Sequence, residues 1–189
     1  MLNDQVRGDS IEFAKDEVIA QWAIDDTRLF GELYNRYFDR VYRYCAVRLG
    51  DAEAAQDTAS ITFTKAMLGI ASFQGGLFSA WLFRIAHNVV IDHQRSIKPT
   101  VPLEFAGVAL DPSDSPEVIA VRNDEARRLY SLLSQLTHDQ RSVIELRLAG
   151  LNGNEIAEAL GMRRNTVDVN ARRAILKLRD LMAESGGAP

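Results

Sequence analysis

Apolar residues recur along most of this chain at steps of three and four, which is the spacing of an amphipathic α-helix. The pattern is clearest between Thr27 and Leu49, with Asp26 as the expected N-cap and Gly50 as the expected end. Its apolar positions are Phe30, Leu33, Tyr34, Tyr37, Val41, Tyr44 and Cys45. Comparable patterns predict helices at about Ile11–Trp22, Ser79–Arg95, Glu117–Leu136 and His138–Ala149, and a further helix that Asp51 can cap and that runs to about Ile70. Strand-like alternation is nearly absent, so the sequence predicts an all-α fold.

The predicted helices fall into two groups that are separated by a proline-rich stretch. Residues 98–116 hold four of the five prolines of the chain, and proline breaks helices and favours extended geometry in the residue before it. Between Ser96 and Glu117, four acids stand against one lysine, Lys98. The sequence therefore predicts two small helical domains, residues 1–97 and 117–189, joined by a flexible acidic linker, residues 98–116.

The most informative segment runs from Leu151 to Leu178 and has the pattern of a helix-turn-helix. Asn152 can cap the first helix, and Glu155 follows three residues later, where a capping box has its second member. Gly161 stands where the chain needs a residue that tolerates positive φ. In the second helix, the expected inward side chains are Val167, Ile175 and Leu178, and the expected cations are Arg163, Arg164, Arg172, Arg173, Lys177 and Arg179.

A short helix, a tight glycine turn and a basic second helix are the parts that place a recognition helix in the major groove of DNA. The competing interpretation is an ordinary helical hairpin with a charged solvent face. Capping, glycine position, helix length and basic clustering all agree with each other, and this agreement favours DNA binding.

Composition narrows the class of protein. Of the 189 residues, 47% are hydrophobic and 25% are charged, as in a globular protein. No apolar run approaches the roughly 20 residues that span a bilayer, and the N-terminus lacks a signal pattern, so we expect a cytoplasmic protein without membrane insertion. The single cysteine, Cys45, excludes an internal disulfide and is expected to be packed or half-buried.

The net charge of -4 argues against indiscriminate DNA binding, because the positive charge is local to the last helix. The sequence has no Ser/His/Asp set, phosphate loop or paired carboxylate site, so we do not expect an enzyme. His87, His93 and His138 are too scattered for a metal cluster, and His87 is expected at the surface. We expect neither a metal nor a cofactor.

A second candidate site lies between Phe73 and Arg95. Its aromatic residues can stack on unpaired bases and its arginines can neutralise phosphates, as in proteins that bind single-stranded DNA. The residues concerned are Phe73, Gln74, Phe78, Trp81, Arg84, His87, Asn88 and Arg95. The alternative is that the aromatic residues belong to the core and the arginines to a solvated face. Composition alone favours this alternative.

Taken together, the motifs resemble an extracytoplasmic-function sigma factor of bacterial RNA polymerase. LFGELYNRYFDRVYRYCAVRLGD looks like the opening helix of sigma region two, and DAEAAQDTASITFTKAM is similar to the helix after it. In that second helix Ala55, Asp57, Thr62 and Phe63 match the family pattern, whereas Gln56, Ser60 and Ile61 depart from it. FSAWLFRIAHNVVIDHQRS matches through Trp81, Leu82, Ile85, Ala86, Asn88, Asp92 and Arg95.

LSQLTHDQRSVIELRLAGLNGNEIAEALGM resembles region four through Leu136, Gln140, Arg141, Leu146, Arg147, Leu151, Glu155, Ile156, Ala157, Leu160 and Gly161. The recognition helix keeps Thr166, Val167, Arg173 and Ala174. It has Arg163, Asn165 and Asp168 where the family usually has Ser, Gly and Lys, which predicts a promoter preference of its own.

The resemblance implies a sigma factor that directs core RNA polymerase to promoters and assists melting. Region four would sit on the β-flap and read the -35 element with Arg163, Arg164, Asn165, Thr166, Asn170, Arg172, Arg173 and Lys177. Region two would capture the melted -10 element with the eight residues of the second candidate site. It would dock on the clamp helices of the polymerase through Asp57, Ser60 and Phe63. The acidic linker would pass through the active-site cleft, and an anti-sigma factor is an expected partner.

Two other functions stay open at this point. A dimeric helix-turn-helix regulator would bind palindromic sites tightly without polymerase. An interaction protein that only sequesters polymerase or another regulator would inhibit transcription and never initiate it.

Overall fold

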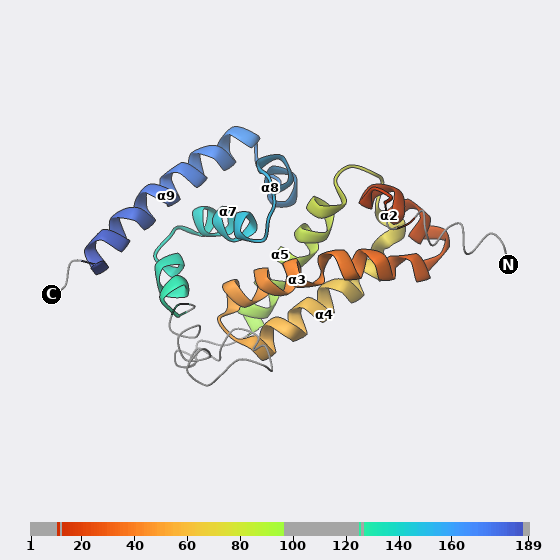
Figure 1. Cartoon of the computed structure of the whole chain (residues 1–189), viewed down its shortest axis with the longest axis horizontal. Coiled ribbons are helices and arrows are strands. Elements are labelled where there is room, and N and C mark those ends of the chain that lie inside the picture. Colours follow the sequence, from red (N-terminus) through yellow and green to blue (C-terminus); the bar gives the residue numbers. More distant parts are fainter. Residues whose placement is uncertain (1–10, 12, 97–124, 126, 187–189) are drawn as a thin grey trace.

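The computed structural model describes residues 11, 13–96, 125 and 127–186 (Figure 1). The helices of the first domain are α2 (Asp16–Asp25), α3 (Phe30–Leu49), α4 (Ala52–Gly69) and α5 (Phe78–Ser96), with 3-10 turns η1 (Thr27–Leu29) and η2 (Ile70–Ser72). Those of the second domain are residues 127–134, α7 (His138–Leu148), α8 (Gly153–Leu160) and α9 (Arg164–Gly186). The described residues contain no strand, which confirms the all-α prediction. The predicted linker, residues 98–116, lies outside the described residues.

The ends of α3 and α4 follow from local capping. The Asp26 carboxylate accepts a hydrogen bond from the Arg28 amide at 3.1 Å, so the predicted cap is confirmed, although the first turn is η1. Gly50 ends α3 with φ of 71°, in the left-handed region. The Asp51 side chain then accepts from the Ala54 amide at 2.7 Å and starts α4.

The first helix was misplaced by the sequence pattern. The pattern predicted about Ile11–Trp22, whereas α2 runs from Asp16 to Asp25. The side chain of its N-cap, Lys15, makes no capping hydrogen bond, and the start is marked only by the acids Asp16 and Glu17 in the first turn. Apolar spacing identifies the buried face of a helix but does not by itself locate its ends.

The first domain is built around α3. Figure 1 shows α3 and α4 running alongside each other, with α5 passing across them. Aromatic rings fill the space between these helices: Tyr44 meets Phe83 edge-on with centroids 5.9 Å apart, and Tyr37 meets Phe78 at 5.4 Å. Each fully buried large apolar side chain contributes about 1.5–3 kcal/mol to folding. Cys45 is fully buried, as predicted.

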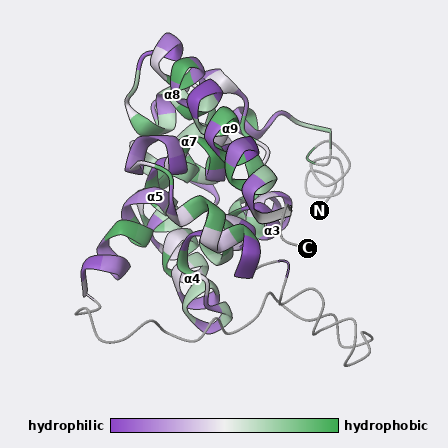
Figure 2. Ribbon diagram, turned by 90° about the vertical axis from the view of Figure 1, so that its left-hand side faces the viewer, coloured by the Kyte–Doolittle hydropathy of each residue, from purple (hydrophilic) through white to green (hydrophobic). Residues whose placement is uncertain are grey.

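The two domains share one continuous apolar core. Ile156 and Val167 of the second domain belong to the same buried cluster as Leu33 and Phe83 of the first, and all four are 0% exposed. In Figure 2 hydrophobic and hydrophilic residues alternate along α5, α7 and α8. The domains are therefore docked, with α8 against α5 and α7 against α3.

Candidate nucleic-acid and polymerase interfaces

The first helix of the helix-turn-helix is held by the predicted capping box. The Asn152 side chain accepts hydrogen bonds from the amides of Asn154 and Glu155 at 2.9 and 3.1 Å. The Glu155 carboxylate in turn accepts from the Asn152 amide at 2.6 Å. Gly161 has φ of 63° and ends α8. These local predictions are confirmed.

The recognition helix α9 packs through small residues. Val167, Ala171 and Ala174 are 0%, 4% and 0% exposed, and Leu178 is half-buried. The prediction that Ile175 points inward is wrong, because it is 55% exposed. At about 100° per residue, Ile175 lies about 80° around the helix from Val167, whereas the alanines lie within about 40°.

The rest of α9 is open to solvent and carries polar and basic side chains, together with the exposed apolar side chains Val169, Ile175 and Leu176. Of the predicted -35 residues, Asn170 is half-buried, and the exposed ones are Arg163, Arg164, Asn165, Thr166, Arg172, Arg173 and Lys177. Lys177 donates a hydrogen bond to the Gln135 carbonyl. Arg164, the first residue of α9, pairs with Asp168 one turn later. This ion pair holds the pKa of the Asp168 carboxyl below its usual range, so the acid stays charged on a cationic face.

The aromatic residues of the second candidate site belong to the core. Phe73 is 2% exposed, Phe78 is 0% exposed, and their ring centroids lie 5.8 Å apart. Trp81 is half-buried against Phe73 at 5.6 Å. In this conformation Phe73 and Phe78 offer no free face to a base. This corrects the expectation that these two rings are stacking platforms, because burying them stabilises the turn before α5.

Some polar residues of this site are exposed to solvent, and others are hydrogen-bonded to the second domain. Gln74, Asn88 and Arg95 are exposed. Arg84 is also exposed, but its Nη2 donates to the Glu158 carbonyl of α8 at 2.6 Å. Ser79, at the start of α5, donates to the Glu155 carboxylate at 2.5 Å. The second domain therefore covers part of the predicted -10 surface.

His87 lies inside the domain interface, so its predicted surface position is wrong for this structure. Its Nδ1 is 2.9 Å from the Tyr44 hydroxyl, and its ring centroid is 6.1 Å from that of His138. Burial, with the nearby positive charge of Arg48, lowers the pKa of His87 to about 4. The imidazole is therefore neutral at pH 7.

A buried ion pair crosses the interface, and sequence reasoning missed it. Arg48 of α3 donates to Glu145 of α7 at 2.8 Å, and their side chains are 4% and 0% exposed. Arg141 also binds Glu145 at 2.6 Å and donates to the Arg48 carbonyl at 3.0 Å. Arg40 adds a bond to the Ala149 carbonyl at 3.0 Å. The only sequence signal was the position of Glu145 within an apolar stretch of α7.

The predicted polymerase-docking residues lie on α4. Asp57 and Ser60 are exposed, whereas Phe63 is 4% exposed and packs edge-on against Tyr34 at 4.8 Å. Ser60 and Phe63 line a shallow groove between α4 and the start of α3. The groove is also lined by Thr27, Arg28, Phe30, Gly31, Tyr34, Thr64 and Met67. Phe63 therefore forms the floor of this groove.

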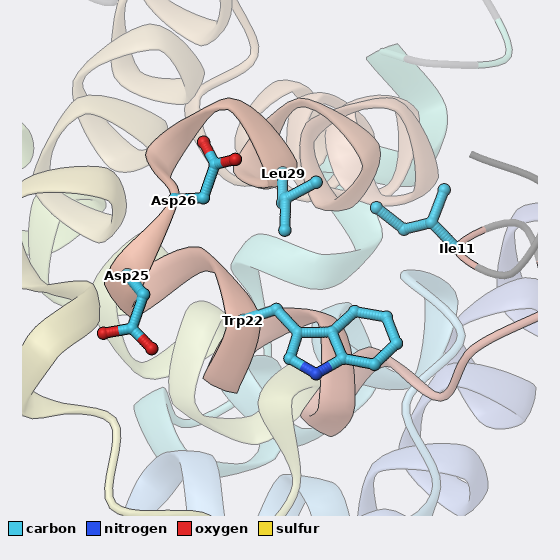
Figure 3. A pocket seen from close by; sticks show the side chains of 5 residues that line it. All are labelled: Ile11, Trp22, Asp25, Asp26 and Leu29. Carbon is cyan, nitrogen blue, oxygen red and sulfur yellow. The ribbon is translucent and has the colours of Figure 1, made fainter. Parts of the chain in front are cut away.

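A separate pocket of about 100 Å³ lies beside α2 and is lined by Ile11, Trp22, Asp25, Asp26 and Leu29 (Figure 3). It is smaller than the roughly 300–1,000 Å³ of typical small-molecule sites. The Asp26 carboxylate already binds the Arg28 guanidinium at 2.9 and 2.7 Å. Among the described residues no group of acids, histidines and cysteines could hold a metal, and no helix is long and apolar enough to cross a membrane.

Comparison with known proteins identifies both domains. The Sigma-70 region 2 model matches residues 33–100, and the Sigma-70, region 4 model matches residues 126–178. The chain is 33% identical over 159 residues to the RNA polymerase sigma factor YlaC of Bacillus subtilis, covering 82% of this chain and 92% of YlaC. It is 31% identical over 174 residues to the ECF RNA polymerase sigma factor BldN of Streptomyces coelicolor, covering 89% of this chain and 66% of BldN.

The structure of CnrH in complex with the cytosolic domain of CnrY has the same fold, with a TM-score of 0.73 and 26% identity. That match covers 89% of this chain and 97% of CnrH. The region 2 model matches the part of the chain that contains α3, α4 and α5, and the region 4 model matches the part that contains the capped helix-turn-helix. This chain belongs to the ECF RNA polymerase sigma factors.

Proposed function

We propose that this chain brings core RNA polymerase to its own set of promoters, reading the -35 element as duplex and the -10 element as melted strand. The observation that carries this proposal is the capped helix-turn-helix whose second helix packs through Val167, Ala171 and Ala174 and exposes its cations. That face suits the phosphates and base edges of a major groove. In this role the chain acts in the cytoplasm and catalyses no reaction itself.

The domain division follows the same proposal. Residues 1–97 act as region two, residues 98–116 as the linker and residues 117–189 as region four. The -35 contacts are those of the exposed α9 face, from Arg163 to Lys177. In region two, the exposed groups Gln74, Asn88 and Arg95 and the half-buried Trp81 are the best candidates for the melted strand. Phe73 and Phe78 support them from the core.

Polymerase docking fits the groove on α4. Exposed Asp57 and Ser60 supply polar contacts beside an apolar floor at Phe63, and Met67 at 42% exposure adds apolar surface at the same place. A polar rim around an apolar centre is the usual composition of a protein interface. The clamp helices of the polymerase are the expected occupant, and the β-flap is the expected support for region four.

The docked arrangement is not ready to bind a promoter. Arg84 of the predicted -10 surface and the nearby Ser79 of α5 are bonded to α8, so these bonds must break before this surface contacts DNA. Polymerase binding therefore has to separate the two domains. An anti-sigma factor that binds the closed chain would oppose this separation.

Reconstituted transcription tests the proposal. Purified protein with bacterial core polymerase should give transcripts from specific start sites, and the protein alone should bind the same promoter duplex weakly. Arg164→Ala should weaken promoters that depend on the -35 element, whereas Gln74→Ala should reduce permanganate reactivity in the -10 region. The absence of any specific transcript would refute the proposal. A dimer that holds a palindrome at nanomolar affinity without polymerase would instead support the regulator.

A further inference from the structure

One arginine of the recognition helix is held in place on two sides. Arg164 is the first residue of α9, where a recognition helix reaches the base edges. Its Nη1 pairs with Oδ1 of Asp168 one turn later, and Nη2 of Arg147 lies 3.9 Å from the same oxygen. The three side chains are 43–49% exposed, so this cluster lies at the surface that would face DNA.

On its second side, the Arg164 guanidinium packs against the backbone of Gly153, which has no side chain. A β-carbon placed on Gly153 would lie 2.6 Å from both Nε and Nη2 of Arg164, and closer still to Cζ. Ordinary contacts between such atoms are about 3.5–4.0 Å, so there is no room for a side chain. Because Cζ is the nearest atom, the added carbon would meet the flat face of the guanidinium. The group therefore lies face-down on the first residue of α8.

Helix geometry does not explain the glycine. Gly153 is not among the described glycines with positive φ, and the first position of a helix does not require a glycine. The Arg164 guanidinium occupies the space that a side chain at position 153 would fill. The guanidinium face lies on Gly153 and Nη1 points toward Asp168. The edge formed by Nε and Nη2 is left for another partner. Within the described part of the chain, this edge has no hydrogen-bond partner.

We propose that this edge of Arg164 reads one guanine of the -35 element, and that Asp168 and Gly153 are positioning residues for it. The inference rests on the proposed function and deepens it. A paired arginine edge matches O6 and N7 of guanine, which form the commonest specific arginine contact in the major groove. Holding the group in advance reduces the side-chain entropy lost on binding.

A phosphate contact by Arg164 makes the opposite prediction for Asp168. An acid on a DNA-facing helix repels phosphates, so its removal would strengthen binding to every sequence. A positioning acid instead improves the discrimination of one base pair at the expense of general affinity. Removal of Asp168 therefore distinguishes a phosphate contact by Arg164 from a guanine contact, because only the guanine contact predicts a weaker preference for guanine.

The experiment uses holoenzyme formed with bacterial core polymerase and a promoter library randomised across the -35 element. Transcript sequencing gives the preference at each position. Arg164→Ala should reduce the preference for guanine at one position by about tenfold or more, the range of a lost bidentate contact. Asp168→Asn and Gly153→Ala should weaken the preference at that same position by roughly two- to tenfold, the effect of freeing one immobilised side chain and no more than that of Arg164→Ala, and leave the other positions unchanged. Asp168→Asn should add nothing in the Arg164→Ala background.

Two matched controls separate positioning from charge and from helix stability. Asp180→Asn makes the same charge change on α9 at an exposed side chain whose partner, Arg179, is 3.8 Å away. Asn154→Ala replaces the exposed side chain next to Gly153 in α8 by a good helix former and adds no atom beneath Arg164. Neither control should alter the preference. Gly153→Ala should keep the thermal midpoint of the wild type, because the atom it displaces is the far end of a flexible side chain.

The inference is overturned by an Asp168→Asn variant that raises transcription from all sequences as Asp180→Asn does and keeps the guanine preference. It is also overturned by an effect of Asp168→Asn at a different base position, because Asp168 would then contact DNA itself. Failure of the proposed function looks different. In that case wild-type holoenzyme shows no preference at any position, and both proposals fall together.

Discussion

Replacing Glu145 by glutamine tests whether the buried ion pair holds the two domains together. The substitution keeps the size of the side chain and removes its charge. In the docked structure Glu145 is 0% exposed and balances Arg48, whose side chain is 4% exposed. Without the carboxylate, the Arg48 guanidinium faces that of Arg141 with no acid between them. Removing one partner of a buried pair typically costs about 3–5 kcal/mol.

The chain can escape part of this cost by separating its domains. Once the interface opens, Arg48 reaches water and its charge no longer needs a protein partner. The measured loss is therefore limited by the free energy of docking. A loss of about 3 kcal/mol corresponds to a factor of roughly 150 in the docking equilibrium. Glu145→Gln should then populate an extended molecule whose individual helices remain folded.

Small-angle scattering and urea unfolding check this outcome together. The radius of gyration should increase in Glu145→Gln, and far-ultraviolet circular dichroism in the absence of urea should stay close to that of the wild type. Glu184→Gln, at an exposed position of α9, is the matched control and should change neither quantity. An unchanged radius and an unchanged urea midpoint in Glu145→Gln would refute the assigned role.

The paired apolar variant Arg48→Met/Glu145→Met extends the test. Nε of Arg48 is buried without a hydrogen-bond partner among the described residues, so the ion pair is imperfectly satisfied. Replacement of such pairs by packed apolar residues is often neutral or stabilising. Arg141 also loses its acid, but its side chain is 14% exposed and keeps its hydrogen bond to the backbone carbonyl of residue 48. The double variant should therefore stay closed. Its transcription at limiting polymerase should fall below that of the wild type, whereas that of Glu145→Gln should rise.

The remaining predictions concern single side chains. Because the pKa of His87 falls to about 4 from an ordinary value near 6.5, its neutral form stabilises the folded chain above pH 6.5, and this contribution of up to about 3 kcal/mol is lost as the pH falls toward 4. His87→Gln should flatten that part of the wild-type profile in pH-dependent urea unfolding; an identical slope would contradict the assignment. Burial raises the pKa of the Cys45 thiol to about 12, so a thiol reagent at pH 8 should react with it only after urea is added. Asn152→Ala should lower the free energy of unfolding by about 1 kcal/mol through the lost cap, as measured by urea titration.

The sequence predicted those features that depend on neighbours within a few residues. Asp51, Gly50 and Asn152 were found because a cap needs only a short side chain or a glycine at one position. The α9 cations were found because they cluster in one stretch of sequence, and α9 buries only the narrow stripe of Val167, Ala171 and Ala174. The inward position of Ile175 failed because the small residues Ala171 and Ala174 make a better buried stripe than their hydropathy suggests.

Features that join distant parts of the chain could not be predicted. Arg48 and Glu145 are 97 residues apart, and nothing near either one requires a partner. His87 looked like a surface group because its partners, Tyr44 and His138, lie 43 and 51 residues away in the sequence. Phe73 and Phe78 could be core or exposed from spacing alone. Gly153 was overlooked because its role depends on a side chain in the next helix.

The acids of the interface each keep a partner within their own domain, and this suits an interface that must open. Glu145 retains Arg141, four residues away on α7, when it loses Arg48. Glu155 retains the Asn152 amide through one oxygen when its other oxygen releases Ser79. Loss of the hydrogen bond between Ser79 and Glu155 costs about 1 kcal/mol, because both groups return to water. Opening therefore leaves no acid buried and unpaired, and the capping box keeps α8 folded. The helix-turn-helix can then reach DNA with Arg164 still held on Gly153.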